Sequence, residues 1–71
     1  SEELVMLAIA KAENLEVSDD EYDASVERYT RSFGFESSEE LISQYGKDLI
    51  RKQALYDKVL DFLLENAVKA E

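Results

Sequence analysis

The chain has 71 residues, so it forms one domain at most, and a domain of this size buries only about 60% of the surface that its unfolded chain exposes. It contains no Cys and no His, which excludes disulfides, thiolate or imidazole zinc sites, and Ser–His or Cys–His nucleophilic pairs. Association with a second copy, or with the rest of a longer protein, is the remaining route to extra stability.

The charge is strongly negative and unevenly distributed. Seventeen Asp and Glu against eight Lys and Arg give a net charge of -9, which repels phosphate backbones and anionic lipid surfaces. We therefore expect neither nucleic acid nor a membrane as partner. Residues 1 to 48 hold thirteen acidic and four basic residues, whereas residues 49 to 71 hold four of each. The longest uncharged run, residues 4 to 10, is too short to cross a bilayer.

The spacing of apolar residues and the absence of Pro predict an all-α fold of four helices, three short and one long. The first covers roughly residues 2 to 14 and is expected to begin upstream of Ser1. Its apolar side chains surround the whole circumference, a pattern typical of a helix buried on all sides.

The second and third helices carry explicit start and stop signals. Ser18 and Glu21 have the capping-box spacing, and Gly34 is placed to end the second helix. Its expected buried stripe is Tyr22, Val26, Tyr29 and Phe33. The third helix repeats the pattern in two turns, with Ser37 as cap, Glu40 as its reciprocal partner, Gly46 as stop, and Leu41, Ile42 and Tyr45 as the stripe.

The fourth helix runs from about Asp48 to Ala70 without a breaker and would be about 34 Å long. A compact chain of this size has a diameter just under about 30 Å, so this helix is predicted to act as an arm or a brace. Its main apolar face is expected to form the core, and comprises Leu49, Gln53, Tyr56, Leu60, Leu63 and Ala67, with Leu64 alongside.

A second apolar stripe on the fourth helix is the candidate binding surface. Leu55 and Phe62 project away from the main face, Val59 lies between the two sets, and the outer edge is formed by Arg51, Lys58 and Lys69. Exposed apolar side chains with a polar rim are typical of protein-binding surfaces. The alternative is that the third helix or a neighbouring chain covers them. The complete set of candidate binding residues is Leu55, Val59, Phe62, Met6 and Phe35.

The acidic clusters do not predict a catalytic or metal site. Asp19, Asp20, Glu21 and Asp23 lack the glycine turn of a calcium loop, and they fall in the first turn of a helix, where they complement its dipole. The pair Glu39 and Glu40, and the ladder Asp57, Asp61 and Glu65, are typical of solvated helix faces. We therefore predict no metal, no cofactor and no catalytic residue.

Three features resemble the C-terminal domain of bacterial trigger factor, the ribosome-associated chaperone. They are an apolar helix ending at Lys11 to Asn14, a Val-Ser-Asp helix start at Val17 to Asp19, and the closing sequence VLDFL at Val59 to Leu63. The resemblance covers essentially all 71 residues and implies the last part of that domain, whose helical arms cradle unfolded and newly made polypeptides.

The resemblance also limits what can be transferred to this chain. The family's ribosome-docking loop carries Gly-Phe-Arg, whereas here Gly34 and Phe35 are followed by Glu36, and the β-rich peptidyl-prolyl isomerase domain is absent. The resemblance thus implies ribosome contact only through other domains of the whole protein. It also implies a cytoplasmic location. Isomerase activity is not expected of this chain. Binding of unfolded or nascent polypeptide without ATP is the first hypothesis. The alternatives are a docking or homodimerisation module and a helical region of periplasmic parvulin-linked chaperones.

Overall fold

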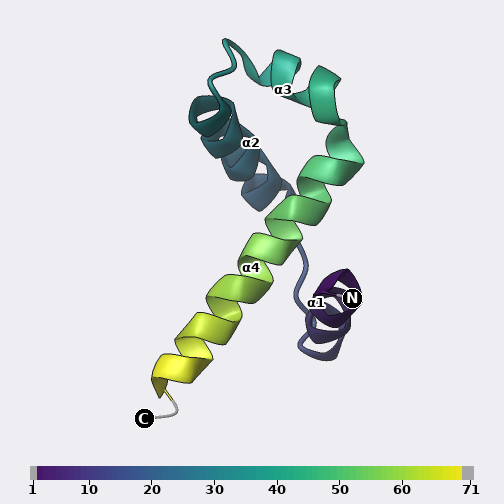
Figure 1. Ribbon diagram of the computed structural model, residues 1–71, viewed down its shortest axis with the longest axis vertical. Coiled ribbons are helices and arrows are strands. Elements are labelled where there is room, and N and C mark those ends of the chain that lie inside the picture. The colour runs from purple at the N-terminus through teal and green to yellow at the C-terminus, as the bar shows by residue number, and fades with distance from the viewer. Residues whose placement is uncertain (1, 70–71) are drawn as a thin grey trace.

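The computed structural model describes residues 2–69 and the side chains of residues 3–67, so Ser1, Ala70 and the Lys69 side chain lie outside the described part. Within it the chain forms four α-helices and no strand: α1 (Glu2–Ala12), α2 (Asp19–Phe33), α3 (Ser38–Tyr45) and α4 (Lys47–Lys69). The predicted all-α fold is confirmed. Helix α4 runs along the molecule, with α2 and α1 on opposite sides of it and α3 near its start (Figure 1).

The molecule is elongated. Its principal extents are 42 × 23 × 22 Å and its radius of gyration is 13.5 Å, against about 11 Å for a compact chain of this length. The radius of gyration exceeds that of a compact chain because the C-terminal half of α4 extends beyond the other helices (Figure 1). The predicted arm is therefore present.

The start of α2 is fixed by a complete capping box. The Ser18 hydroxyl accepts a hydrogen bond from the Glu21 N–H (3.1 Å), and the Glu21 carboxylate accepts one from the Ser18 N–H (3.0 Å). These bonds satisfy backbone donors that a helix leaves unpaired in its first turn. Gly34 ends the helix at φ 79°, a left-handed conformation that glycine adopts without steric penalty.

Helix α3 departs from its predicted cap in one respect. Ser37 accepts from the Glu40 N–H (3.3 Å), as expected, but the Glu40 carboxylate accepts from the N–H of Glu36 at 3.4 Å instead of that of Ser37. The reciprocal bond reaches one residue further back. Gly46, at φ 86°, follows α3 and precedes α4.

The core lies where α2, α3 and the first half of α4 meet. Its buried residues are Val26, Tyr29, Leu41 and Ile50, and Tyr22, Phe35 and Ile42 pack against them. Two residues of the predicted stripes lie outside it, because Phe33 and Tyr45 are exposed at 57% and 44%. Helix α1 is likewise not buried on all sides, since it packs against α4 alone and leaves Leu4, Val5 and Leu7 exposed.

Helix α4 buries two faces, and neither is the predicted one. Ile50 and Ala54 face α2 and α3, whereas Val59, with 0% exposure, lies nine residues and about 180° from Ile50. The second face also carries Lys52, whose ammonium pairs with Glu3 of α1. The predicted core face lies between these two and is open, with Leu49, Leu60, Leu63 and Leu64 all exposed. That prediction was wrong because it assigned α4 a single partner.

The basic residues of α4 point to acidic or carbonyl groups of the N-terminal half. Arg51 donates to the Val17 carbonyl (2.8 Å) and pairs with Asp19, while its guanidinium stacks over the Tyr22 ring. Lys58 donates to the Glu16 carbonyl (2.6 Å) and to the Glu21 carboxylate (2.9 Å). The neutral helix thus holds the segment that links α1 to α2.

Glu21 is expected to titrate far below an ordinary glutamate. The Ser18 N–H bond, the Lys58 ammonium and the Ser18 hydroxyl together lower its pKa from 4.5 to about 2. Because the folded-state pKa is the lower one, this stabilisation is present above pH 4.5 and is lost as the pH falls towards 2. A carboxyl-detected NMR titration should show this pKa, and Lys58→Gln should raise it. Ser43→Ala, an exposed serine inside α3, is the control and should leave it unchanged.

The buried and the open face of α4 can be tested with adjacent residues. Ile50→Ala should lower the free energy of unfolding by about 2–5 kcal/mol, because it empties a buried position. Leu49→Ala should change it by no more than about 0.5 kcal/mol, because that side chain is half exposed. Urea unfolding monitored by circular dichroism measures both, and a larger loss for Leu49→Ala would restore the original face assignment.

Candidate functional site

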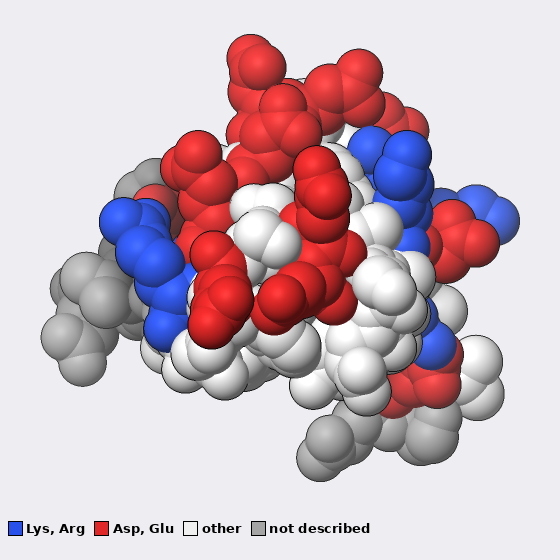
Figure 2. Space-filling view, turned by 90° about the horizontal axis from the view of Figure 1, so that it is seen from above, with Lys and Arg blue, Asp and Glu red and all other residues white. Residues whose placement is uncertain are grey.

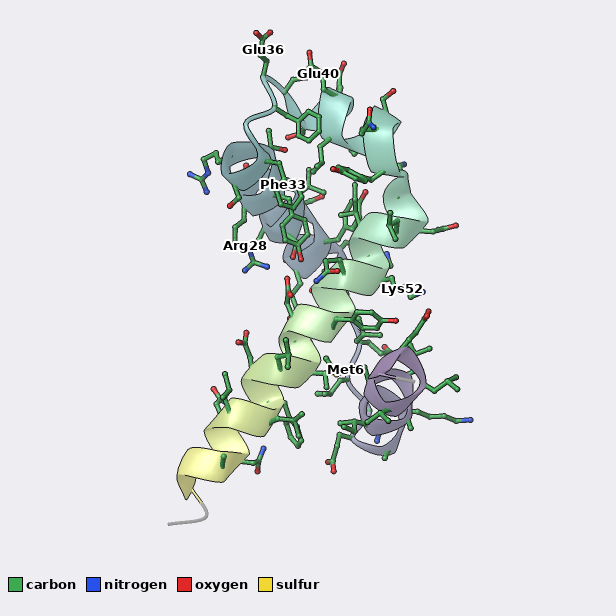
Figure 3. All side chains as sticks on the ribbon, viewed as in Figure 1. Met6, Arg28, Phe33, Glu36, Glu40 and Lys52 are labelled. Carbon is green, nitrogen blue, oxygen red and sulfur yellow. The ribbon has the colours of Figure 1, made fainter. Side chains whose placement is uncertain are left out.

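An apolar groove lies between α2, α3 and α4. It encloses about 410 Å³, its floor includes Leu41 and Ile50, and its rim includes Phe33, Tyr45 and Leu49. Each of the three rim residues exposes more than 40% of its surface. Phe33 lies on the side of α2 that faces this space (Figure 3). The groove therefore offers large apolar side chains to any molecule that enters it.

Aromatic rings fix the shape of the rim. The Phe33 ring stacks on Tyr29 with centroids 5.7 Å apart, and its edge contact with Tyr45 has a centroid distance of 6.1 Å. Phe35 makes a similar edge contact with Tyr45 at 6.1 Å. Such pairs contribute about 0.5–1.5 kcal/mol each beyond burial of area. The exposed rings are thus held in defined positions.

A hydrogen-bonded carboxylate lines the groove. Asp57 of α4 accepts hydrogen bonds from the Tyr29 hydroxyl, from the Arg28 guanidinium (3.0 Å) and from the Gln53 amide (3.2 Å). Burial, and then the hydrogen bond to Asp57, raise the pKa of Tyr29 above its usual value. This network joins α2 to α4 beside the groove.

The open face of α4 continues the apolar surface beyond the groove. Leu49 belongs to the groove rim, and Leu60, Leu63 and Leu64 follow on the same sector of the helix. Leu64 is exposed at 65%. We call Leu49, Leu60, Leu63 and Leu64 the exposed leucine face. The sequence contained these leucines, but their pattern was assigned to the core.

The structure places the five predicted binding residues mostly against the chain itself. Val59 is fully buried, which corrects its expected position on a surface. Leu55 and Phe62 are half-buried on the same side of α4 as Val59, Met6 is half-buried and points from α1 towards α4 (Figure 3), and Phe35 packs on the core. The groove and the exposed leucine face are the open apolar surfaces that the sequence did not identify. A role in binding for the five residues stays a prediction.

The end of the molecule formed by α3 is acidic. Asp and Glu side chains gather on the face seen from this end (Figure 2), and Glu36 and Glu40 project from it (Figure 3). Residues 32–46 contain Glu36, Glu39 and Glu40 and no Lys or Arg. This charge repels polyanions from the end of the groove nearest α3.

The described residues contain no group of three or more His, Cys, Asp or Glu side chains placed to hold a metal ion. Among the helices of the described part, none is long and apolar enough to span a membrane.

Comparison with known proteins assigns the fold. The family model of the bacterial trigger factor C-terminus matches residues 1–65. The chain belongs to this family. Three relatives named trigger factor illustrate the match: those of Bacillus subtilis (38% identity over 65 residues), Staphylococcus epidermidis (36% over 69) and Agathobacter rectalis (34% over 65). The aligned segments cover 89%, 96% and 89% of this chain.

The match extends over only a small part of each trigger factor. It covers 15% of the B. subtilis and A. rectalis proteins and 16% of the S. epidermidis protein. No solved structure matches the chain. The predicted resemblance to the trigger factor C-terminus is confirmed at the level of the family, and the groove described above lies within the matched residues.

The hydrogen bond to Asp57 can be tested through Tyr29. Asp57→Asn should bring the Tyr29 pKa down towards its ordinary value, leaving the part that burial contributes. Because the pKa of Tyr29 is raised in the fold, its contribution to stability is complete below the ordinary tyrosine pKa of 10.0 and is lost as the pH rises from there through the folded-state pKa. Absorbance titration of tyrosinate measures the shift, and Tyr29→Phe identifies the signal. The same Tyr29 titration in wild type and Asp57→Asn would contradict the assigned bond.

Proposed function

We propose that the chain binds unfolded or newly made polypeptide as part of a chaperone, through the groove and the exposed leucine face and without ATP. Attachment to the ribosome through other parts of the whole protein, and work in the cytoplasm, belong to the same proposal. The single observation that carries it is the exposed apolar surface on a chain of the trigger factor family. Exposed apolar surface of this kind is typical of protein-binding sites.

The dimensions of the surface favour an extended client. Leu49 and Leu64 are fifteen residues apart on one helix, which places them about 22 Å apart along its axis. An extended segment of about seven residues spans the same distance. Aliphatic and aromatic side chains without a fixed polar pattern favour tolerance of many client sequences, because such contacts require apolar area and not a defined set of hydrogen bonds.

The test is suppression of aggregation by the 71-residue chain and its variants. Phe33→Ser combined with Leu60→Ser should weaken protection of a denatured client several-fold, because hot-spot contacts of large apolar residues commonly contribute more than about 1 kcal/mol each. Leu60 is exposed, but Phe33→Ser also removes two ring contacts, so the free energy of unfolding should fall by up to about 3 kcal/mol, and protection is compared where circular dichroism shows both variants folded. Lys47→Ser with Glu65→Ser, exposed polar positions on α4, is the matched control. Equal protection by the two double variants would exclude this surface.

The second candidate is a docking or dimerisation module, favoured by the same exposed leucine face. A second copy covering that face would hide it from clients. Sedimentation equilibrium over a range of protein concentrations distinguishes the two. A tight dimer that is broken by Leu60→Ser and shows no client protection would favour the module.

A further inference from the structure

We propose that α1 is a removable cover over a second apolar surface on α4, and that it opens as a unit while α2, α3 and the first half of α4 stay folded. The covered surface consists of Leu55, Val59 and Phe62, which occupy one side of the helix at spacings of four and three residues. Val59 at its centre has no exposed surface. The cover lies on the side of α4 away from α2 (Figure 1).

The cover has little apolar attachment of its own. Helix α1 packs against α4 and against no other described helix, and its one buried residue is the small Ala10. Leu4, Val5 and Leu7 are exposed at 68%, 57% and 39%. None of its residues belongs to the core cluster. Opening α1 therefore leaves that cluster intact.

The edge of the cover is open to solvent. A groove of about 490 Å³ lies there between Leu7 and Leu15 on one side and Lys52 and Leu55 on the other. In addition, the Tyr56 hydroxyl, whose ring lies under the Lys52 ammonium, is buried without a hydrogen-bond partner among the described residues. Water would satisfy that hydroxyl once the cover opens.

Polar contacts at the edge hold the cover closed. The Lys52 ammonium pairs with Glu3, and the linker after α1 is held by Lys58 at the Glu16 carbonyl and by Arg51 at the Val17 carbonyl. These side chains are partly exposed, and ion pairs in such positions are weak. The closed state thus combines apolar contact on Val59 with a few polar contacts at the edge that can be removed one at a time.

The experiment uses Val59→Cys as a reporter. The chain contains no Cys, so a thiol reagent reports position 59 alone, and the change from valine alters side-chain volume little. Adding Lys52→Gln and Lys58→Gln should raise the labelling rate about tenfold, because both edge contacts are lost. Arg28→Gln is the control: it removes the ion pair with Asp57, which joins α4 to α2 and not to α1, and it should leave the rate unchanged.

Several outcomes would overturn the proposal. One is an unchanged rate in the double variant, and another is an equal increase with Arg28→Gln. A third is labelling that occurs only with loss of total helix signal in circular dichroism. Amide hydrogen exchange of the unaltered chain provides an independent measurement: α1 should exchange much faster than Val26, Tyr29 and Leu41, and equal protection also contradicts the cover.

The labelling and exchange measurements need no client, so they test the opening of α1 independently of the proposed function. The consequence for binding rests on the proposed function: opening would add Leu55, Val59 and Phe62 to the binding surface. Client protection should then increase in Lys52→Gln with Lys58→Gln. If labelling of Val59→Cys becomes faster but client protection does not increase, the opening of α1 would be supported and its role in client binding would be rejected.

Discussion

The structure depends on one helix that is buried on two opposite sides. Ile50 and Val59 lie about half a turn of rotation apart on α4, and both are almost fully enclosed. A helix with this requirement needs neighbours on both sides, and the chain supplies α2 with α3 on one and α1 on the other. The sector between them receives no neighbour. It contains the exposed leucine face, so the binding surface proposed here follows from how α4 is enclosed.

The two sides are not enclosed with equal strength. On the side of α2 and α3, aromatic and aliphatic residues form the core, and the hydrogen-bonded Asp57 adds to it. On the side of α1, Val59 is enclosed but α1 itself buries only Ala10 among its described residues, and the contacts at the edge are ionic or go to carbonyl oxygens. Apolar burial contributes about 25 cal/mol per Å², whereas exposed ion pairs contribute little. The second side is therefore the weaker one.

The charge distribution has a structural role that the sequence only partly indicated. Residues 49 to 71 are neutral because they hold four basic residues against four acidic ones, and three of the basic residues pair with acids of α1 and α2. The sequence analysis placed the candidate binding stripe on this neutral helix, with Arg51 and Lys58 at its outer edge. In the structure, Arg51, Lys52 and Lys58 instead connect it to the acidic half of the same chain. The net charge of a segment does not reveal which of its charged side chains form ion pairs with the rest of the chain.

The ends of the helices could be predicted from the sequence, but the helices that pack against each face of α4 could not. Ser18 with Glu21, and Gly34, fix the ends of α2 through bonds between residues close in the chain, and the structure confirms them. The face of α4 that is buried depends on which helices pack on it, and spacing alone reveals apolar sectors without naming their neighbours. Leu55 and Leu60 both fit an apolar pattern, and only the position of α1 makes one half-buried and the other exposed.

The lengths of the helices explain why the open sector persists. Helix α3 has eight residues and spans about 12 Å, whereas α4 has twenty-three and spans about 34 Å. Gly46 joins them directly, so α3 begins its contact at the first turns of α4 and ends there. Its Leu41 packs with Ile50 in the core, and its Tyr45 forms one wall of the groove. It is too short to reach Leu60 or Leu64, which stay exposed because no described helix is long enough and correctly placed to cover them.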